Sequence, residues 1–112
     1  MDADAQIAPL AALMVTLVVE GTFQDGYEEH FAEYSRRVRT YLERHGGIVI
    51  RRQRIEKTLA GSEAPSLIML IDFPSREVAE GILEQPEYLE ILPLRAKVFR
   101  EFRAYLAGGE EI

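Results

Sequence analysis

The chain has 112 residues, of which 47% are hydrophobic and 29% charged, and its formal net charge is −6 at pH 7. This length fits one domain with one core, and this composition excludes a disordered or fibrous protein. The acidic charge disfavours nucleic-acid binding, because neutralising phosphates needs clustered Lys and Arg. The absence of cysteine excludes disulfides, thiol nucleophiles and thiolate metal sites, and it fits a reducing cytoplasm.

Residues 1–12 are predicted to form a flexible N-terminal lead. The apolar stretch Ile7–Val19 differs from a secretory signal, because acidic and not basic residues precede it. It is also shorter than the ~20 apolar residues that span a bilayer. We therefore expect a cytoplasmic protein without a membrane segment, with a single domain over residues 13–108 and a tail over 109–112.

The first elements of the domain are predicted to be a strand and a helix. The β-branched run Leu13–Val19 is typical of a strand that is buried on both faces. Asp25 is the expected N-cap of a helix that ends at Gly46 and Gly47, which suit the left-handed geometry of a helix C-terminus. The apolar face of this helix, spaced by four, three, four and three residues, comprises Tyr27, Phe31, Tyr34, Val38 and Tyr41.

A hairpin is expected next, followed by a second helix. Residues 48–59 and 66–73 are rich in β-branched and apolar residues, and the segment Gly61–Pro65 between them has the composition of a hairpin loop. Ser75 is the expected N-cap of a helix that Pro86 breaks. The two segments therefore predict antiparallel strands that lead into a capped helix.

The end of the domain predicts a short helical continuation over residues 86–97 and a last strand over 99–107, where apolar and polar residues alternate. The resulting order is β-α-β-β-α-β. This is the α+β arrangement of the ferredoxin-like fold, a four-stranded antiparallel sheet with both helices on one face.

The second face of this sheet should be polar, because no helix covers it, yet the segments 13–19 and 67–71 are apolar at nearly every position. Large exposed apolar patches are rare on monomers. A second copy of the chain, packed sheet against sheet, is the simplest cover for this face. The sequence therefore predicts a homodimer.

Several motifs at characteristic spacings carry a resemblance to a known family. They are Gly46 and Gly47, Arg52, the segment DFPS at Asp72–Ser75, the segment PEY at Pro86–Tyr88, Arg95 and Gly108. Over residues 13–108 the chain resembles the domain-of-unknown-function 1330 (DUF1330) family, within the dimeric α/β-barrel superfamily. The resemblance implies the ferredoxin-like fold and a dimer, and superfamily members tend to use the cleft between the sheet and its helices.

Two arginines are the main candidates for a ligand site in that cleft, because the family also carries arginine at Arg52 and Arg95. An arginine can hold a carboxylate through two parallel hydrogen bonds. Arg52 and Arg54 share one face of their strand and Arg51 has the other. The alternative is that Arg52 is solvated or paired with glutamate, and that Arg95 forms an interface or helix-end ion pair with Glu87 or Glu90.

His30 and Asp72 are the candidate catalytic residues. His30 flanks the apolar face of the first helix, where a neutral imidazole could act as a general base or a haem ligand. Asp72 ends the third strand and could act as a base in the cleft. The alternatives are that His30 is an ordinary surface residue and that Asp72 caps the turn before Pro74.

Tyr34 and Tyr88 are further candidate ligand-binding residues, and Tyr34 could contribute to a stacking wall for an aromatic ligand. Tyr34 belongs to a series of tyrosines at seven-residue intervals, which is also typical of core packing. The chain has no HxxxH or HExxH pair, no glycine-rich phosphate loop and no Gly-x-Ser-x-Gly elbow, so we expect no metal, nucleotide or other cofactor.

Two functions remain open from the sequence. The first is a small dimeric protein whose cleft binds, or also transforms, a small organic acid or aromatic metabolite. The second is a non-catalytic binding or assembly module whose arginines stabilise the dimer. The sequence alone does not decide whether the protein is an enzyme.

Overall fold

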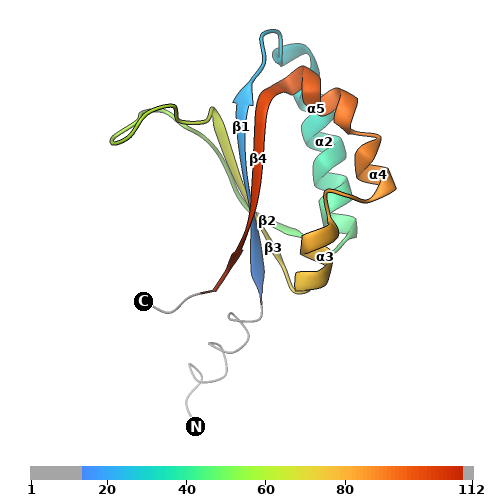
Figure 1. Ribbon diagram of the computed structural model, residues 1–112. Coiled ribbons are helices and arrows are strands. Elements are labelled where there is room, and N and C mark those ends of the chain that lie inside the picture. Colours follow the sequence, from blue (N-terminus) through green and yellow to red (C-terminus); the bar gives the residue numbers. More distant parts are fainter. Residues whose placement is uncertain (1–13, 110–112) are drawn as a thin grey trace.

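The computed structural model describes residues 14–109, so Leu13, the expected N-terminal lead and the last three residues lie outside the described part of the chain. Figure 1 shows a curved sheet with a layer of helices on one side. The elements follow in the order β1 (Val15–Phe23), α2 (Glu28–Arg44), β2 (Ile48–Arg54), β3 (Leu67–Phe73), α3 (Arg76–Gly81), α4 (Pro86–Leu89), α5 (Leu92–Val98) and β4 (Phe99–Gly108).

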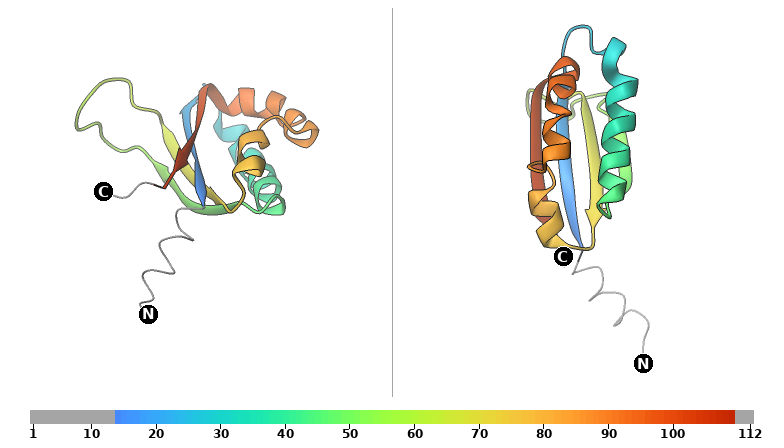
Figure 2. Two further views of the ribbon diagram at one scale, coloured as in Figure 1. Left: turned by 60° about the horizontal axis from the view of Figure 1, so that its bottom comes forward. Right: turned by 90° about the vertical axis from the view of Figure 1, so that its right-hand side faces the viewer.

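The four strands form one antiparallel sheet in the order β2-β3-β1-β4. All of the helices cover the same face, as the side view in Figure 2 shows. This confirms the predicted ferredoxin-like β-α-β-β-α-β arrangement. The second helical connection is divided into the short helices α3, α4 and α5, because Pro86 and Pro93 each stand in the first turn of a new helix.

Strand β1 is the centre of the sheet and its helix-facing residues belong to the core. Val15, Leu17 and Val19 are each at most 5% exposed, and the alternate residues between them are only partly buried. The strand continues past Val19, the last residue of the predicted strand, and through Gly21 to Phe23. The ring of Phe99 covers this position so closely that a Cβ on Gly21 would lie 2.4 Å from it.

Helix α2 packs its apolar face on the sheet, with Tyr34, Val38, Tyr41 and Leu42 buried. The predicted N-cap is wrong, because the helix begins later than expected, at Glu28, and no side chain caps its first turn. Acidic residues in that turn complement the positive end of the helix dipole. The helix ends before Gly46, which has a φ of 87° that suits glycine, so the predicted C-terminus is confirmed.

Strand β2 is shorter than predicted and ends at Arg54. Arg54 pairs with Leu67, the first residue of β3, and one further backbone hydrogen bond joins the Ile55 amide to the Ser66 carbonyl at 2.9 Å before the chain leaves the sheet. Residues 55–66 form a loop that projects away from the helices, as both Figure 1 and the left view of Figure 2 show. The hairpin itself is confirmed.

The sheet face without helices, here called the open face, carries both apolar and charged residues. Val18, Ile68 and Leu70 lie at its centre, where neighbouring strands leave them only partly buried. Tyr105 pairs with Val18 and is 49% exposed. The apolar second face expected from the sequence is therefore present, and within the described residues no element covers it.

The connection between β3 and α4 is held by two side chains. The Ser75 hydroxyl accepts a hydrogen bond from the Val78 amide at 3.2 Å, which confirms Ser75 as the N-cap of α3. The buried Tyr41 hydroxyl donates to the Ile82 carbonyl at 2.6 Å and so joins α2 to the end of α3.

Candidate functional site

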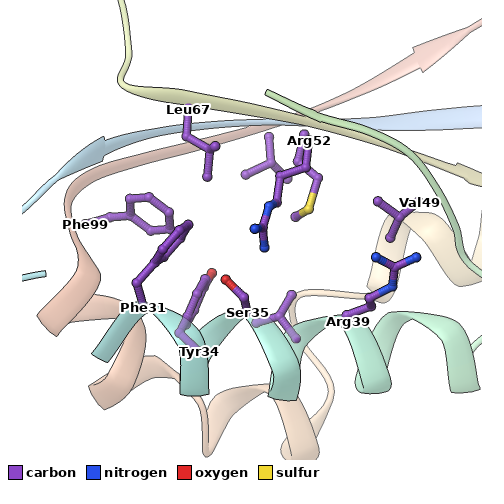
Figure 3. Close-up of a pocket in the computed structure, with 11 residues that line it drawn as sticks. Phe31, Tyr34, Ser35, Arg39, Val49, Arg52, Leu67 and Phe99 are labelled. Carbon is purple, nitrogen blue, oxygen red and sulfur yellow. The ribbon is translucent and has the colours of Figure 1, made fainter. Parts of the chain in front are cut away.

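A pocket lies between the helix-facing side of the sheet and α2, near the edge strand β2 (Figure 3). Strands β1, β2 and β3 supply one wall, α2 the other, and the start of β4 closes one end. The lining residues are Val19, Phe31, Tyr34, Ser35, Val38, Arg39, Val49, Arg52, Leu67, Met69 and Phe99. The walls are therefore apolar and aromatic, with a few polar groups among them.

The polar groups of the pocket are two hydroxyls and two guanidinium groups. Figure 3 shows the hydroxyls of Tyr34 and Ser35 and the guanidinium of Arg52 pointing toward one another across the pocket. Arg39 adds a second cation from α2, with its Nε 3.5 Å from Glu43 Oε1. No acidic side chain is among the described lining residues, so the pocket is locally cationic although the chain carries a net charge of −6.

Arg52 is placed on the helix-facing side of β2, opposite Met69 of β3. Its guanidinium carbon lies 5.2 Å from the centre of the Phe31 ring, a cation–π contact. Its side chain forms no ion pair within residues 14–109. Arg52 is therefore an exposed cation at the pocket mouth whose charge no carboxylate of the described chain neutralises.

Arg54 also faces the helices, whereas Arg51 pairs with Leu70 and faces the open side, as predicted from the strand alternation. The Arg54 guanidinium lies 4.7 Å from the centre of the Phe23 ring and donates to the Tyr27 hydroxyl at 3.1 Å. These contacts hold it outside the pocket, beside the N-terminal end of α2.

Arg95 and Tyr88 lie on the other side of α2 from Arg52, next to Tyr34. Arg95 donates from Nη1 to the Tyr88 hydroxyl at 3.1 Å, and its guanidinium lies 4.2 Å from the centre of the Phe102 ring. Neither ion pair considered in the sequence analysis is present among the described residues, since Glu87 pairs with Arg44 instead. Tyr88 is 1% exposed and does not line the pocket.

Tyr34 connects the pocket with Tyr88 and Arg95. Burial raises the pKa of Tyr34 well above its ordinary value of 10.0, the neighbouring Tyr88 raises it further, and the Arg95 cation lowers it. Tyr34 therefore stays protonated over the whole physiological range. In that form its hydroxyl has one hydrogen to donate.

The two candidate catalytic residues lie elsewhere. Asp72 faces the open side of the sheet, where its Oδ1 accepts a hydrogen bond from the Thr16 hydroxyl at 2.6 Å. His30 is on α2 but does not line the pocket, and its Nε2 lies 3.9 Å from Glu29 Oε2. The structure thus brings together Arg52 and Tyr34, places Arg95 and Tyr88 directly behind Tyr34, and leaves His30 and Asp72 apart from the pocket.

Ser35, Arg39 and Phe99 line the pocket but were not singled out in the sequence analysis. Arg39 follows Ser35 by four residues and is therefore on the same side of α2. That spacing could have indicated Ser35 and Arg39 as pocket residues, because residues at the flank of an apolar helix face lie next to the edge of the sheet. Nothing in the local sequence indicates Phe99, which reaches the pocket through the sheet pairing.

A family model described as "Domain of unknown function (DUF1330)" matches residues 14–107. The chain belongs to the DUF1330 family. This confirms the resemblance noted from the glycine, arginine and proline motifs. No curated protein sequence matches this DUF1330 chain.

Solved structures with the same fold include three informative neighbours. RPA0582 of Rhodopseudomonas palustris, a protein of unknown function, is 17% identical with a TM-score of 0.70, over 100% of this chain and 97% of its own. A dimeric ferredoxin-like protein of unknown function from Jannaschia sp. CCS1 is 12% identical, with a TM-score of 0.68. The match covers 86% of this chain and 99% of that protein. SnoaB, a cofactor-independent oxygenase from Streptomyces nogalater, is 18% identical, with a TM-score of 0.61. The match covers 90% of this chain and 97% of SnoaB.

At these identities the neighbours show the ferredoxin-like fold of the DUF1330 chain and nothing of its chemistry. Among residues 14–109, no group of three or more His, Cys, Asp or Glu side chains is arranged to hold a metal ion. The described helices also include none that is long and apolar enough to cross a membrane.

Proposed function

We propose that this DUF1330 protein is a homodimer that binds a small organic acid with an apolar or aromatic body in the pocket between the sheet and α2. The observation that carries the proposal is the composition of the pocket. Its walls are apolar and aromatic, and its only charged lining residues within the described chain are Arg39 and Arg52. A carboxylate attached to a hydrophobic body matches both properties.

Entry of such an acid requires Arg52 to move. The cavity has a volume of about 40 Å³ in this conformation. This is room for a few water molecules and is well below the ~300 Å³ of a small-molecule site. The Arg52 side chain is exposed and has no acidic partner among the described residues, so it can leave the Phe31 ring at little cost. Its guanidinium would then pair with the carboxylate, while Phe31 becomes free to contact the ligand body.

The proposed dimer uses the open face. Val18, Ile68, Leu70 and Tyr105 supply an apolar centre there, which a second copy would remove from water. The neighbour from Jannaschia sp. CCS1 is described as dimeric, which supports the proposal. Because Arg52 and Arg95 lie on the helix side of the sheet, the alternative in which these arginines join the two subunits has less support than a ligand role.

The proposed function is binding, and we assign no catalytic residue. The described lining residues include no histidine and no carboxylate that could act as a general base. His30 and Asp72 remain candidates only for a reaction that takes place outside this pocket.

Calorimetric titration with phenylacetate, and with the neutral phenylacetamide of the same shape, tests the proposal. We expect the acid to bind and the amide to bind at least tenfold more weakly, because only the acid forms a charge-assisted pair with Arg52. Arg52→Gln should weaken phenylacetate binding about tenfold or more. Arg51→Gln removes a guanidinium from the opposite face of the same strand and should leave binding unchanged. Equal affinity for acid and amide, or equal effects of the two variants, would contradict the proposed site.

A further inference from the structure

The two cations of the pocket lie at successive positions along it. Phe31, Ser35 and Arg39 follow one another at intervals of four residues on α2, so they lie on the same side of the helix and extend over about 12 Å of it. Figure 3 shows the Arg52 guanidinium near the middle of this line, opposite Ser35, and the Arg39 guanidinium beside Val49. The function proposed above pairs Arg52 with a carboxylate and leaves Arg39 without a role.

An irregularity in β2 determines where Arg52 enters the pocket. Val49 and Arg52 are three residues apart and would face opposite sides of a regular strand. The register of β2 against β3 shifts between Val49 and Arg51, which adds one residue to β2, and both Val49 and Arg52 line the pocket as a result. Arg52 therefore enters at the middle of the pocket, and Arg39 is the cation at the Val49 end.

The two ends of the pocket differ in polarity. One end is apolar and aromatic, and Figure 3 shows the side chains of Phe31, Leu67 and Phe99 together there. The charged groups of the described lining lie in the middle and at the other end, on Arg52 and Arg39. A ligand whose hydrophobic body lies at the aromatic end would therefore direct its polar groups past Arg52 toward Arg39.

Both guanidinium groups are accessible to a ligand. Arg52 is exposed and forms no ion pair within residues 14–109. The Arg39 side chain is 62% exposed, and its one ion pair in this part of the chain joins Nε to Glu43 Oε1 at 3.5 Å. An exposed ion pair between residues four apart on a helix adds little to stability, so Arg39 can exchange Glu43 for a carboxylate of the ligand.

We propose that the pocket selects dicarboxylic acids, with one carboxylate held by Arg52 and the second by Arg39. A ligand with one carboxylate pairs with Arg52 and leaves Arg39 to Glu43 or water. A second carboxylate adds a charge-assisted pair without burying another charge, because both arginine side chains are exposed. This inference rests on the proposed function and names its ligand class more closely.

Two pairs of acids that differ by one carboxylate test the selectivity. They are 2-phenylsuccinate against 2-phenylbutyrate and 3-phenylglutarate against 3-phenylpentanoate, and in each pair a methyl group replaces the second carboxylate. The two diacids differ in the spacing of their carboxylates. Calorimetric titration of the full chain should show at least one diacid binding about fivefold more tightly than its partner, which is the size of one ion pair between exposed groups.

Three variants identify the group that produces this preference. Arg39→Gln should reduce it to within about twofold and leave the affinity for the monoacid nearly unchanged, because the monoacid pairs with Arg52. Glu43→Gln removes the competing carboxylate and should increase the preference, a gain that a loss of general stability does not produce. The matched control is Arg36→Gln, because Arg36 is an exposed arginine of the same helix that lines a different groove. That control should keep the full preference.

The outcomes separate this inference from the proposed function. If none of the four acids binds, the proposed function fails and this inference with it. If the acids bind but neither diacid is preferred, or if Arg39→Gln keeps the preference, only the present inference is overturned. If Arg36→Gln lowers the preference as much as Arg39→Gln does, the effect comes from the overall charge of α2, and the specific role of Arg39 is overturned.

Discussion

Tyr34 lines the pocket, and its ionisation makes the stability of the protein depend on pH. Its pKa is raised chiefly by burial, so the folded protein keeps the phenol protonated at pH values where the unfolded chain releases the proton. The unfolded state then binds fewer protons than the native state, and the free energy of unfolding falls as the pH rises through the ordinary tyrosine value of about 10.

Tyr34→Phe should remove this part of the pH dependence. We expect the free energy of unfolding of the variant to fall less steeply above pH 10 than that of the native protein, by up to about 1.4 kcal/mol per pH unit. Denaturant titrations at pH 8, 10 and 11 measure the difference, and the values at pH 8 provide the reference. The same slope in both proteins above pH 10 would show that Tyr34 ionises freely in the folded state.

The sequence predicted part of the site at this scale. Alternation along β2 was enough to place Arg52 and Arg54 together and Arg51 on the other face. The same alternation along β3 separates Asp72 from the buried Ile71, so the position of Asp72 on the open face could have been predicted from the sequence. The contact of Arg95 with Tyr88 was not, because it depends on how α4 turns into α5.

At the scale of elements, the ring of Phe99 at the start of β4 packs closely on β1 at Gly21. Gly21 sits inside β1, and a Cβ there would be 2.4 Å from Cε1 of Phe99. The predicted strand stopped at Val19, before this glycine, and glycine weakens strands in general. The strand continues because an aromatic ring from β4 takes the place of the missing side chain.

Gly21→Ala should therefore destabilise the protein by about 1–3 kcal/mol, the usual cost of overpacking a core. The matched control is Gly81→Ala in α3, where a Cβ would be 3.5 Å from its nearest neighbour, Gln85 Nε2. Alanine favours a helix over glycine, so this control should be neutral or stabilising by about 0.5–1 kcal/mol. Chemical unfolding of both variants measures the contrast, and similar losses in the two would refute the role given to the Phe99 ring.

At the scale of the whole molecule, the two faces of the sheet are covered differently. Helices bury one face, and the open face keeps Val18, Ile68 and Leu70 only partly buried. The sequence predicted both the fold and this uncovered apolar face, because hydrophobic patterns along strands report burial on each side. It did not predict the long loop at residues 55–66. Residues 55–59 have a composition that suits a strand, and they form part of a loop because no partner strand lies beside them.

Ile68→Glu should convert the proposed dimer into a monomer. A two-fold interface would bury the new carboxylate twice without a partner, which costs far more than a surface charge. Sedimentation velocity should show the native protein at twice the mass of one chain and the variant at that of one chain. Leu89→Glu is the matched control, because Leu89 is a 48% exposed leucine on the helical side, and its dimer should persist. A monomeric native protein would contradict the proposed assembly.

The edge strand β2 has a consequence for how the protein behaves at high concentration. Edge strands expose unpaired amides and carbonyls that can recruit a strand of another chain and start aggregation. In β2 a register irregularity between Val49 and Arg51 interrupts that row, and Arg51, Arg52 and Arg54 place like charges along it. Arg52 of the proposed ligand site thus also helps, together with Arg51 and Arg54, to keep this edge from pairing with another chain. Neutralising several of them at once would remove a ligand contact and a safeguard against aggregation together.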